Sequence, residues 1–211
     1  MSIKEQHIMV KSSDEGLRYW INLTNSRGHV GEFATANTTG VTEIVELSVA
    51  TEFAKAFGFV FGVKLENIAG NPHDPPDCIA EIDGRTVQIE LVEMVDSQAI
   101  AMAKKTGRTA RNDVHQFEVT KWDERRFVSK INSLIDKKQR RYQTKGREFE
   151  CLLIYTGEPW LLPGDVSKWL SSNEFEHRDS FRSIYILMSY DPLYSQDHYP
   201  LFNIYGDLRP S

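Results

Sequence analysis

Cysteine is scarce in this sequence, and its placement suggests neither redox nor metal chemistry. Cys78 and Cys151 are the two cysteines among 211 residues, and each lies in an apolar, strand-like segment. The sequence has no CxxC pair and no Cys/His spacing typical of a zinc site. We therefore expect two buried, reduced thiols in a cytoplasmic protein.

Long apolar runs and several common catalytic motifs are also missing. No run approaches the ~20 apolar residues that a membrane-spanning helix needs, and residues 1–11 lack the apolar core of a signal peptide. A glycine-rich phosphate loop and a GxSxG elbow are absent as well. The sequence thus argues against a membrane protein, a P-loop or dinucleotide-binding enzyme, and a hydrolase with a serine or cysteine nucleophile.

Positive charge is in deficit overall but is concentrated in one segment. The chain has 25 Lys and Arg against 30 Asp and Glu, which gives a net charge of −5. Residues 104–147 hold 14 Lys and Arg against 5 Asp and Glu, a surplus of nine positive charges. Such a segment indicates a face that meets a polyanion, although a solvated helix gives the same pattern. Aromatic residues are thinly spread there, which argues against a base-stacking platform for single strands.

The order of expected elements indicates an α/β fold, with a central mixed sheet flanked by helices. Length and composition favour a single domain, in which residues 1–41 decorate the N-terminal side and 189–211 form an edge. Apolar periodicity and Gly, Asp and Pro signals predict helices over residues 42–57, 123–144 and 165–172. The expected strands cover residues 59–65, 78–82, 86–94, 150–156, 183–189 and 200–205. A further helix is expected over residues 97–105 and a basic loop over 104–112.

Three positions are expected to mark where helices begin or end. Gly58 would end the first helix, whereas Asp123 and Asp165 would cap the second and third at their N-termini.

Two acidic residues stand where a carboxylate needs a partner. Asp77 leaves a proline-rich turn, and Glu90 lies inside an apolar strand that follows an Asp83-Gly84 turn. A buried carboxylate without a partner is costly. A hairpin would bring the two acids together, and paired carboxylates suit a hard cation such as Mg²⁺ or Mn²⁺. Such a cation would polarise a phosphoryl oxygen and activate a water molecule.

The residues around this pair are weaker candidates. His73 and Asp74 could join a metal shell beside Asp77, although a histidine in a loop is more often solvated. Glu93 is expected to point to the opposite face of the strand from Glu90. A turn residue for Asp77 and a strand-edge ion pair for Glu90 are the structural alternatives.

A lysine on the apolar face of the long helix is the expected cationic partner of the acids. Lys138 falls on this face, whereas Lys137 points away from it. A lysine there must either extend to solvent or meet an anion. In the second case its ammonium would orient the attacking water or stabilise the charge of the transition state. The apolar face is formed by Phe127, Ile131, Leu134, Ile135 and Tyr142.

These residues resemble the PD-(D/E)xK nuclease superfamily. Pro76-Asp77 matches the first half of its motif, and Glu90-Leu91-Val92 matches the second half in its acid. The lysine of the motif would fall at position 92, where this chain has valine. In many divergent members the lysine lies on the following helix, and the segment Ile135-x-x-Lys138-x-x-x-Tyr142 is similar to that arrangement.

The resemblance implies a restriction-endonuclease-like core over roughly residues 42–188, with an N-terminal extension. It implies a nuclease that hydrolyses phosphodiesters in nucleic acid, with DNA as the expected substrate, and Mg²⁺ (or Mn²⁺) on Asp77 and Glu90. Lys138 would be the relocated catalytic lysine. The family often adds an acid from the first helix, for which Glu46 is the candidate and Glu43 the alternative.

The basic loop is the expected site of substrate contact outside the acids. Its cations suit salt-sensitive, sequence-independent contacts to phosphate groups; they are Lys104, Lys105, Arg108 and Arg111. Association into a homodimer stays open.

Two other functional classes compete with an active nuclease. Val92 at the lysine position favours a nuclease-fold protein that binds nucleic acid or a protein partner without cleaving. An unrelated α/β interaction module, with structural acids, is the third possibility. A distance above about 8 Å between the Asp77 and Glu90 carboxylates would favour that module, because a shared cation needs oxygens at ~2.0–2.6 Å.

Overall fold

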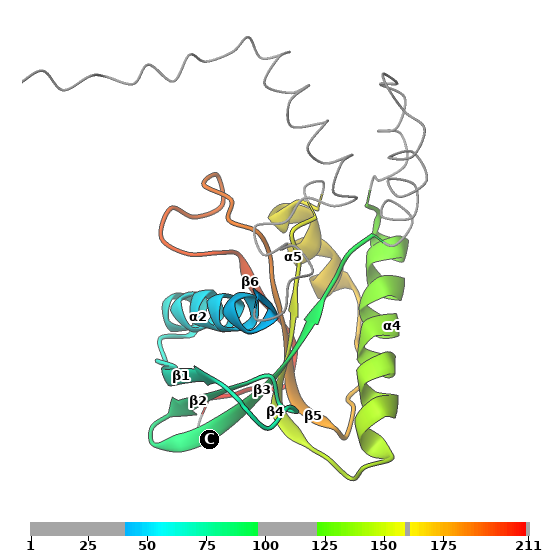
Figure 1. Cartoon of the computed structure of the whole chain (residues 1–211). Helices are drawn as coiled ribbons and strands as arrows, with labels where there is room; N and C mark the ends of the chain where they lie inside the picture. The colour runs from blue at the N-terminus through cyan, green and yellow to red at the C-terminus, as the bar shows by residue number, and fades with distance from the viewer. Residues whose placement is uncertain (1–40, 97–121, 159–160, 210–211) are drawn as a thin grey trace, which may run out of the picture.

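The described part of the chain folds as a six-stranded mixed sheet with helices on both faces (Figure 1). A computed structural model describes residues 41–96, 122–158 and 161–209. The helices are α2 (Val41–Phe61), α4 (Glu124–Gln143) and α5 (Pro163–Ser172). The strands are β1 (Glu66–Gly70), β2 (Cys78–Ile82), β3 (Arg85–Glu93), β4 (Phe149–Tyr155), β5 (Phe181–Leu187) and β6 (Leu201–Tyr205). The expected α/β fold with a mixed sheet is confirmed.

The strands lie side by side in the order in which they follow one another in the sequence. β2 is antiparallel to both β1 and β3, whereas β3, β4 and β5 are parallel and β6 returns antiparallel at the edge. Parallel neighbours need a crossover connection. Helix α4 lies in the connection from β3 to β4, and α5 lies in the connection from β4 to β5.

Alternating side chains of the central strands fill two separate cores. In β3, Val87, Ile89 and Leu91 pack with the buried face of α2, as the period of two predicts. Val92 packs in the other core, which contains the buried residues of α4 and α5. Helix α2 therefore covers one face of the sheet, and α4 and α5 cover the other (Figure 1).

The predicted hairpin forms between β2 and β3. Cys78 pairs with Ile89 at its open end and Ile82 with Arg85 beside the turn. Asp83 and Gly84 have φ values of 49° and 75°, the left-handed conformation that tight two-residue hairpin turns require. The open end of the hairpin is where Asp77 enters β2.

The first helix runs past the glycine that was expected to end it. Gly58 lies inside α2, which continues to Phe61, and Gly62 with φ 70° follows the helix end. A glycine inside a helix costs about 1 kcal/mol, which the packing of buried apolar side chains outweighs here. The rings of Phe57 and Phe61, one turn apart, lie 4.8 Å from each other. The strand expected over residues 59–65 is therefore wrong, and β1 begins later.

The third helix also begins differently from the expectation. Helix α5 starts at Pro163, and its N-cap residue Leu162 makes no side-chain capping hydrogen bond. Asp165 lies inside the first turn and is not the cap. Proline at the first helical position explains the early start, because its fixed φ already suits a helix.

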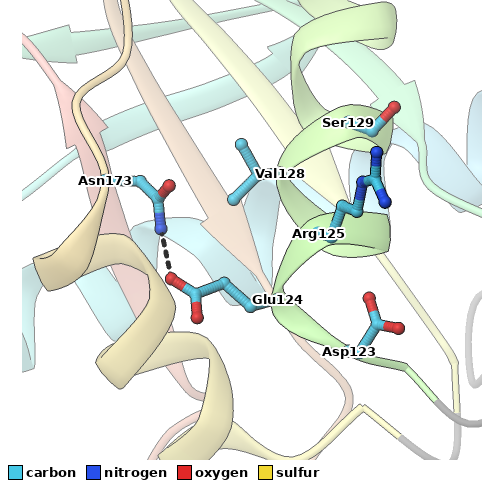
Figure 2. A pocket seen from close by; sticks show the side chains of 6 residues that line it. All are labelled: Asp123, Glu124, Arg125, Val128, Ser129 and Asn173. Carbon is cyan, nitrogen blue, oxygen red and sulfur yellow. Dashed lines mark hydrogen bonds between the residues drawn. The ribbon is translucent and has the colours of Figure 1, made fainter.

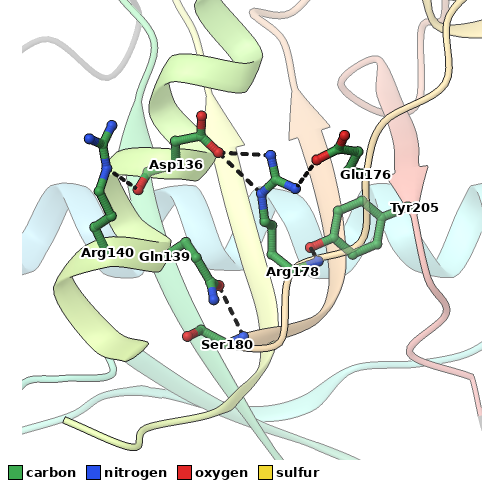
Figure 3. Close-up of polar contacts among 7 residues, drawn as sticks. All are labelled: Asp136, Gln139, Arg140, Glu176, Arg178, Ser180 and Tyr205. Atoms are coloured by element: carbon green, nitrogen blue, oxygen red, sulfur yellow. Dashed lines mark hydrogen bonds and ion pairs between the residues drawn. The ribbon is translucent and has the colours of Figure 1, made fainter. Parts of the chain in front are cut away.

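Helix α4 is fixed at both ends. Asp123 is its N-cap, as expected, and accepts a hydrogen bond of 2.7 Å from the Arg126 backbone N–H. Near its C-terminus, Asp136 accepts hydrogen bonds of 3.1 and 2.8 Å from Arg178 (Figure 3). One turn later, Gln139 accepts a 3.0 Å bond from the Ser180 backbone N–H. These contacts join the last turns of α4 to the start of β5.

Several expectations fall on residues outside the described ranges. They are the N-terminal extension, the helix over residues 97–105 and the basic loop over 104–112. None of the helices within the described ranges combines the length and apolar character needed to cross a membrane.

Candidate metal centre

The turn that carries Asp77 is closed by Asn71. The Asn71 backbone N–H donates to the Asp77 carbonyl at 3.0 Å, and its side-chain amide donates to the Pro76 carbonyl at 2.9 Å. Asp77 in turn accepts a 2.6 Å hydrogen bond from the Leu91 backbone N–H through Oδ2. Asp77 is thereby held against β3, one residue beyond the position of Glu90.

Three carboxylates meet at the open end of the hairpin. Asp74, Asp77 and Glu90 each offer an oxygen, and these oxygens lie within 4.8 Å of one another. Asp74 is exposed, Asp77 is half-buried and Glu90 is buried, so the cluster extends from the core to the surface. Such a set of oxygen donors suits a small, hard divalent cation with water in its remaining positions. Clusters of acidic groups also occur without an ion, so the surroundings of Glu90 carry the argument further.

Glu90 is enclosed by two side chains from α4. The Lys138 ammonium and the Tyr142 hydroxyl both donate to its Oε1. Glu90 is 1% exposed, and a charge removed from water to this extent is tolerated when it is paired and hydrogen-bonded. Its Oε2 is also buried, yet it has no hydrogen-bond partner among the described residues. One oxygen of Glu90 is thus held by protein, and the other retains its capacity for a ligand.

The carboxylates of the cluster repel one another, which favours their protonated forms. Burial, with a smaller contribution from the charge of Glu90, raises the pKa of Asp77 to about 6. The Leu91 N–H bond and the charge of Lys138 oppose it. A cation would relieve the repulsion that raises this pKa.

Glu46, the candidate from the first helix, belongs to the same electrostatic environment. Burial, together with the charges of Asp77, Asp74 and Glu90, raises the pKa of Glu46 to about 7. The structure thus brings Glu46 of α2 close enough to interact with all three acids. Glu43, the alternative, is exposed and contributes least to this shift.

Two residues of the site were given too little weight by sequence reasoning. Asp74, a weak candidate beside His73, joins the cluster through an oxygen. Tyr142 was assigned to the apolar face of the helix, yet its hydroxyl contacts Glu90. Its spacing of four residues from Lys138 was the available signal, because residues four apart share one face of a helix.

The other predicted site residues divide into two groups. Lys138 contacts Glu90 from α4, so this lysine on the apolar helical face meets an anion, while Val92 packs in the core on the α4 side. The four cations of the basic loop, Lys104, Lys105, Arg108 and Arg111, lie outside the described residues. Their contact with phosphate therefore stays a prediction.

A surface depression lies at the other end of α4. It is lined by Asp123, Glu124, Arg125, Val128, Ser129 and Asn173 (Figure 2). Glu124 and Asn173 in it are already joined by a 2.7 Å hydrogen bond, and Asp123 caps the helix. These polar groups have structural partners, so the carboxylate cluster remains the better candidate.

Comparison with protein-family models, with curated proteins and with solved structures finds no match to this chain. The chemistry of the carboxylate cluster therefore has to be inferred from its own geometry.

Proposed function

We propose that this chain is a metal-dependent phosphodiesterase of the PD-(D/E)xK type that cleaves DNA. The observation that carries the proposal is the meeting of three elements at Glu90. The open end of the β2–β3 hairpin supplies two further carboxylates, and α4 supplies a lysine that contacts the buried acid. A lysine beside paired carboxylates is the composition of a site for phosphoryl chemistry.

The residues would divide the work according to their positions. Asp77 and Glu90 would hold Mg²⁺ or Mn²⁺, with Asp74 as a third oxygen donor. A cation bound there would polarise the phosphoryl oxygen and lower the pKa of an attacking water. Lys138 would stabilise the negative charge that develops on the phosphate. Glu46, with its pKa near 7, suits a group that accepts a proton from water near neutral pH.

The fold also supports this assignment. Among the described elements, a helix, three strands, a second helix and a strand parallel to the third follow one another in the sequence. The two motif acids lie just before β2 and inside β3, and Lys138 lies on α4, the next described helix along the chain. This arrangement favours a restriction-endonuclease-like core.

A polyanionic substrate fits the surface beside the cluster. Arg141, Lys145 and Arg147 are exposed at the C-terminal end of α4, and we call them the basic end of α4. Arg147 donates a 3.2 Å hydrogen bond to the Pro75 carbonyl, within the turn that carries Asp74 and Asp77. The basic end of α4 is therefore adjacent to the acids, where a phosphate backbone would need neutralising charge.

The test is cleavage of supercoiled plasmid DNA in the presence of Mn²⁺ or Mg²⁺. We expect the wild-type chain to nick the plasmid and Glu90→Gln and Asp77→Asn to lose about 100-fold or more of that activity. Glu66→Gln, an exposed acid on β1, is the control and should cleave like wild type. Equal cleavage by wild type and Glu90→Gln would remove Glu90 from the mechanism.

A nuclease fold that binds without cleaving is the second candidate function. It is favoured by the contacts of Glu90, whose charge Lys138 already neutralises without a metal. Calorimetric titration with Mn²⁺ separates the two functions. Tight DNA binding with no Mn²⁺ uptake would favour the inactive binder, whereas uptake that is lost in Asp77→Ala would favour the enzyme.

A further inference from the structure

Tyr142 is a neutral hydrogen-bond donor to the buried acid Glu90. Its side chain is fully buried, and its hydroxyl donates to Oε1 of Glu90. Among the described residues, Lys138 makes the other contact to the same oxygen. The two donors differ in charge: the lysine ammonium is positively charged, whereas the tyrosine hydroxyl is a neutral, directional donor.

The ring of Tyr142 is fixed by packing. It meets Phe149 edge-on with centroids 4.8 Å apart, and it meets Phe181 at 6.3 Å and close to a right angle. Edge-to-face contacts of this type restrict how an aromatic ring can turn. The hydrogen bond between Gln139 and the Ser180 backbone holds the preceding turn of α4 against the start of β5. The hydroxyl of Tyr142 is therefore presented to Glu90 by a rigid surround.

The second carboxylate oxygen of Glu90, Oε2, is available to bind a ligand. Oε2 is buried and lacks a hydrogen-bond partner among the described residues, which is unfavourable for a carboxylate oxygen. Glu90 belongs to the group whose oxygens lie within 4.8 Å of one another, with Asp74 and Asp77. A cation among these three acids would supply the partner that the protein does not.

We propose that Tyr142 is a positioning residue that holds Oε1 of Glu90 and so directs Oε2 toward a divalent cation shared with Asp77 and Asp74. The inference rests on the proposed function of this site. In it, the neutral Tyr142 side chain orients Glu90 as a ligand of the cation. Hydrogen bonds to a ligating carboxylate typically change metal affinity by about 10- to 100-fold. Lys138, by contrast, acts mainly through its charge.

The experiment is a calorimetric titration of the full chain with Mn²⁺ alone. Tyr142→Phe removes the hydroxyl and keeps the ring, and we expect the Kd for Mn²⁺ to rise about 10- to 100-fold. Tyr185→Phe is the matched control, because Tyr185 is also buried and its hydroxyl accepts a 3.2 Å hydrogen bond from Leu208. That variant should change the Kd less than twofold, even if it lowers the melting temperature.

A purely structural tyrosine would give a different result. If Tyr142→Phe is less stable but binds Mn²⁺ with the wild-type Kd, the proposal is overturned. Site-specific 4-fluorophenylalanine at position 142 fills the same space without a donor and serves if the phenylalanine variant does not fold. In a Glu90→Gln background, Tyr142→Phe should change Mn²⁺ binding no further, since the hydroxyl acts through Glu90. An additive loss there would also contradict the proposal.

The outcome can be separated from that of the proposed function. If the wild-type chain binds Mn²⁺ but does not cleave plasmid DNA, the nuclease proposal is rejected and the proposed role of Tyr142 stands. If Tyr142→Phe cleaves DNA and binds Mn²⁺ with unchanged affinity, the proposed role of Tyr142 is rejected and the nuclease proposal stands. A wild-type chain that binds no Mn²⁺ would overturn both.

Discussion

The ammonium of Lys138 contacts Oε1 of Glu90 between α4 and β3, with the two side chains 15% and 1% exposed. The contact joins the helix of one core to the central sheet, so it links the stability of the fold to the chemistry of the cluster. Removing one partner of a buried ion pair leaves the other charge without compensation. The consequences can be measured separately for stability and for activity.

Lys138→Met should destabilise the protein strongly. We expect the free energy of unfolding to fall by about 3–5 kcal/mol, because Glu90 would keep a buried charge with no cation beside it. Lys137→Met, on the exposed side of α4, should cost less than about 0.5 kcal/mol. The double variant Lys138→Met/Glu90→Gln should regain most of the loss, because it removes both charges. Urea denaturation measures all four proteins, and a double variant no more stable than Lys138→Met would contradict the prediction.

Val92→Lys should partly replace a missing Lys138. Val92 lies two residues after Glu90 and on the same face of β3, which is the position of the lysine in the PD-(D/E)xK motif. In a Lys138→Met background, we expect Val92→Lys to restore plasmid cleavage by about tenfold or more, since it returns a cation to the acids. Val92→Met in the same background is the control. If Val92→Met restores plasmid cleavage as well as Val92→Lys does, the gain comes from packing rather than from charge.

Asp77→Asn should stabilise the metal-free protein while abolishing metal binding. The pKa of Asp77 is raised from 3.8 to about 6, so the folded chain holds this proton more tightly than the unfolded chain. The associated stability is fully present below about pH 4 and is lost as the pH rises through about 6. At pH 7.5 in EDTA, the substitution should therefore add about 1–2 kcal/mol, after allowance for partial solvent screening.

Urea denaturation at pH 4 and pH 7.5 checks this prediction. Most of the gain should vanish at the lower pH, where Asp77 is protonated in the folded chain and partly protonated in the unfolded chain. Asp83→Asn, in the turn at the far end of the hairpin, is the control and should show little change at either pH. Mn²⁺ at about 100 times its Kd should stabilise the wild-type protein by about 2.7 kcal/mol and leave Asp77→Asn unchanged.

Substituting the basic end of α4 should weaken DNA binding in a salt-dependent way. A variant with Arg141→Gln, Lys145→Gln and Arg147→Gln removes three cations beside the acids. For duplex DNA, the slope of log K against log salt should become shallower by about 2.7, at about 0.9 per phosphate contact. Fluorescence anisotropy in EDTA measures binding without cleavage.

The matched control removes three exposed cations from elsewhere on the fold. It carries Lys64→Gln, Lys168→Gln and Arg182→Gln, which lie outside the end of α4. We expect its salt slope to stay close to that of wild type. Equal slopes for the two variants would mean that net charge, rather than the basic end of α4, governs binding. Cations at a helix C-terminus also favour the helix dipole, so a small loss of stability accompanies the first variant.

Local sequence pattern was enough to predict the elements whose form depends on neighbouring residues. Alternation along β3 placed Val87, Ile89 and Leu91 on one face and Glu90 on the other, because successive side chains of a strand point to opposite sides. The Asp83-Gly84 turn fixed the hairpin, and Asp123 fixed the start of α4. Local pattern failed at Gly58, where the burial of α2 against the sheet outweighed the preference of a single glycine to end a helix.

The side chains that meet at Glu90 depend on how separate elements pack against one another. Lys138 was visible in the sequence as a lysine on an apolar helical face, but its partner depends on how α4 crosses the sheet. That crossing is set by distant contacts, among them Arg178 with Asp136 and Ser180 with Gln139 (Figure 3). The same crossing brings Tyr142 to Glu90, which periodicity alone assigns to the core. Sequence pattern records the period of one element, whereas a site made of a turn, a strand and a helix requires the packing of all three.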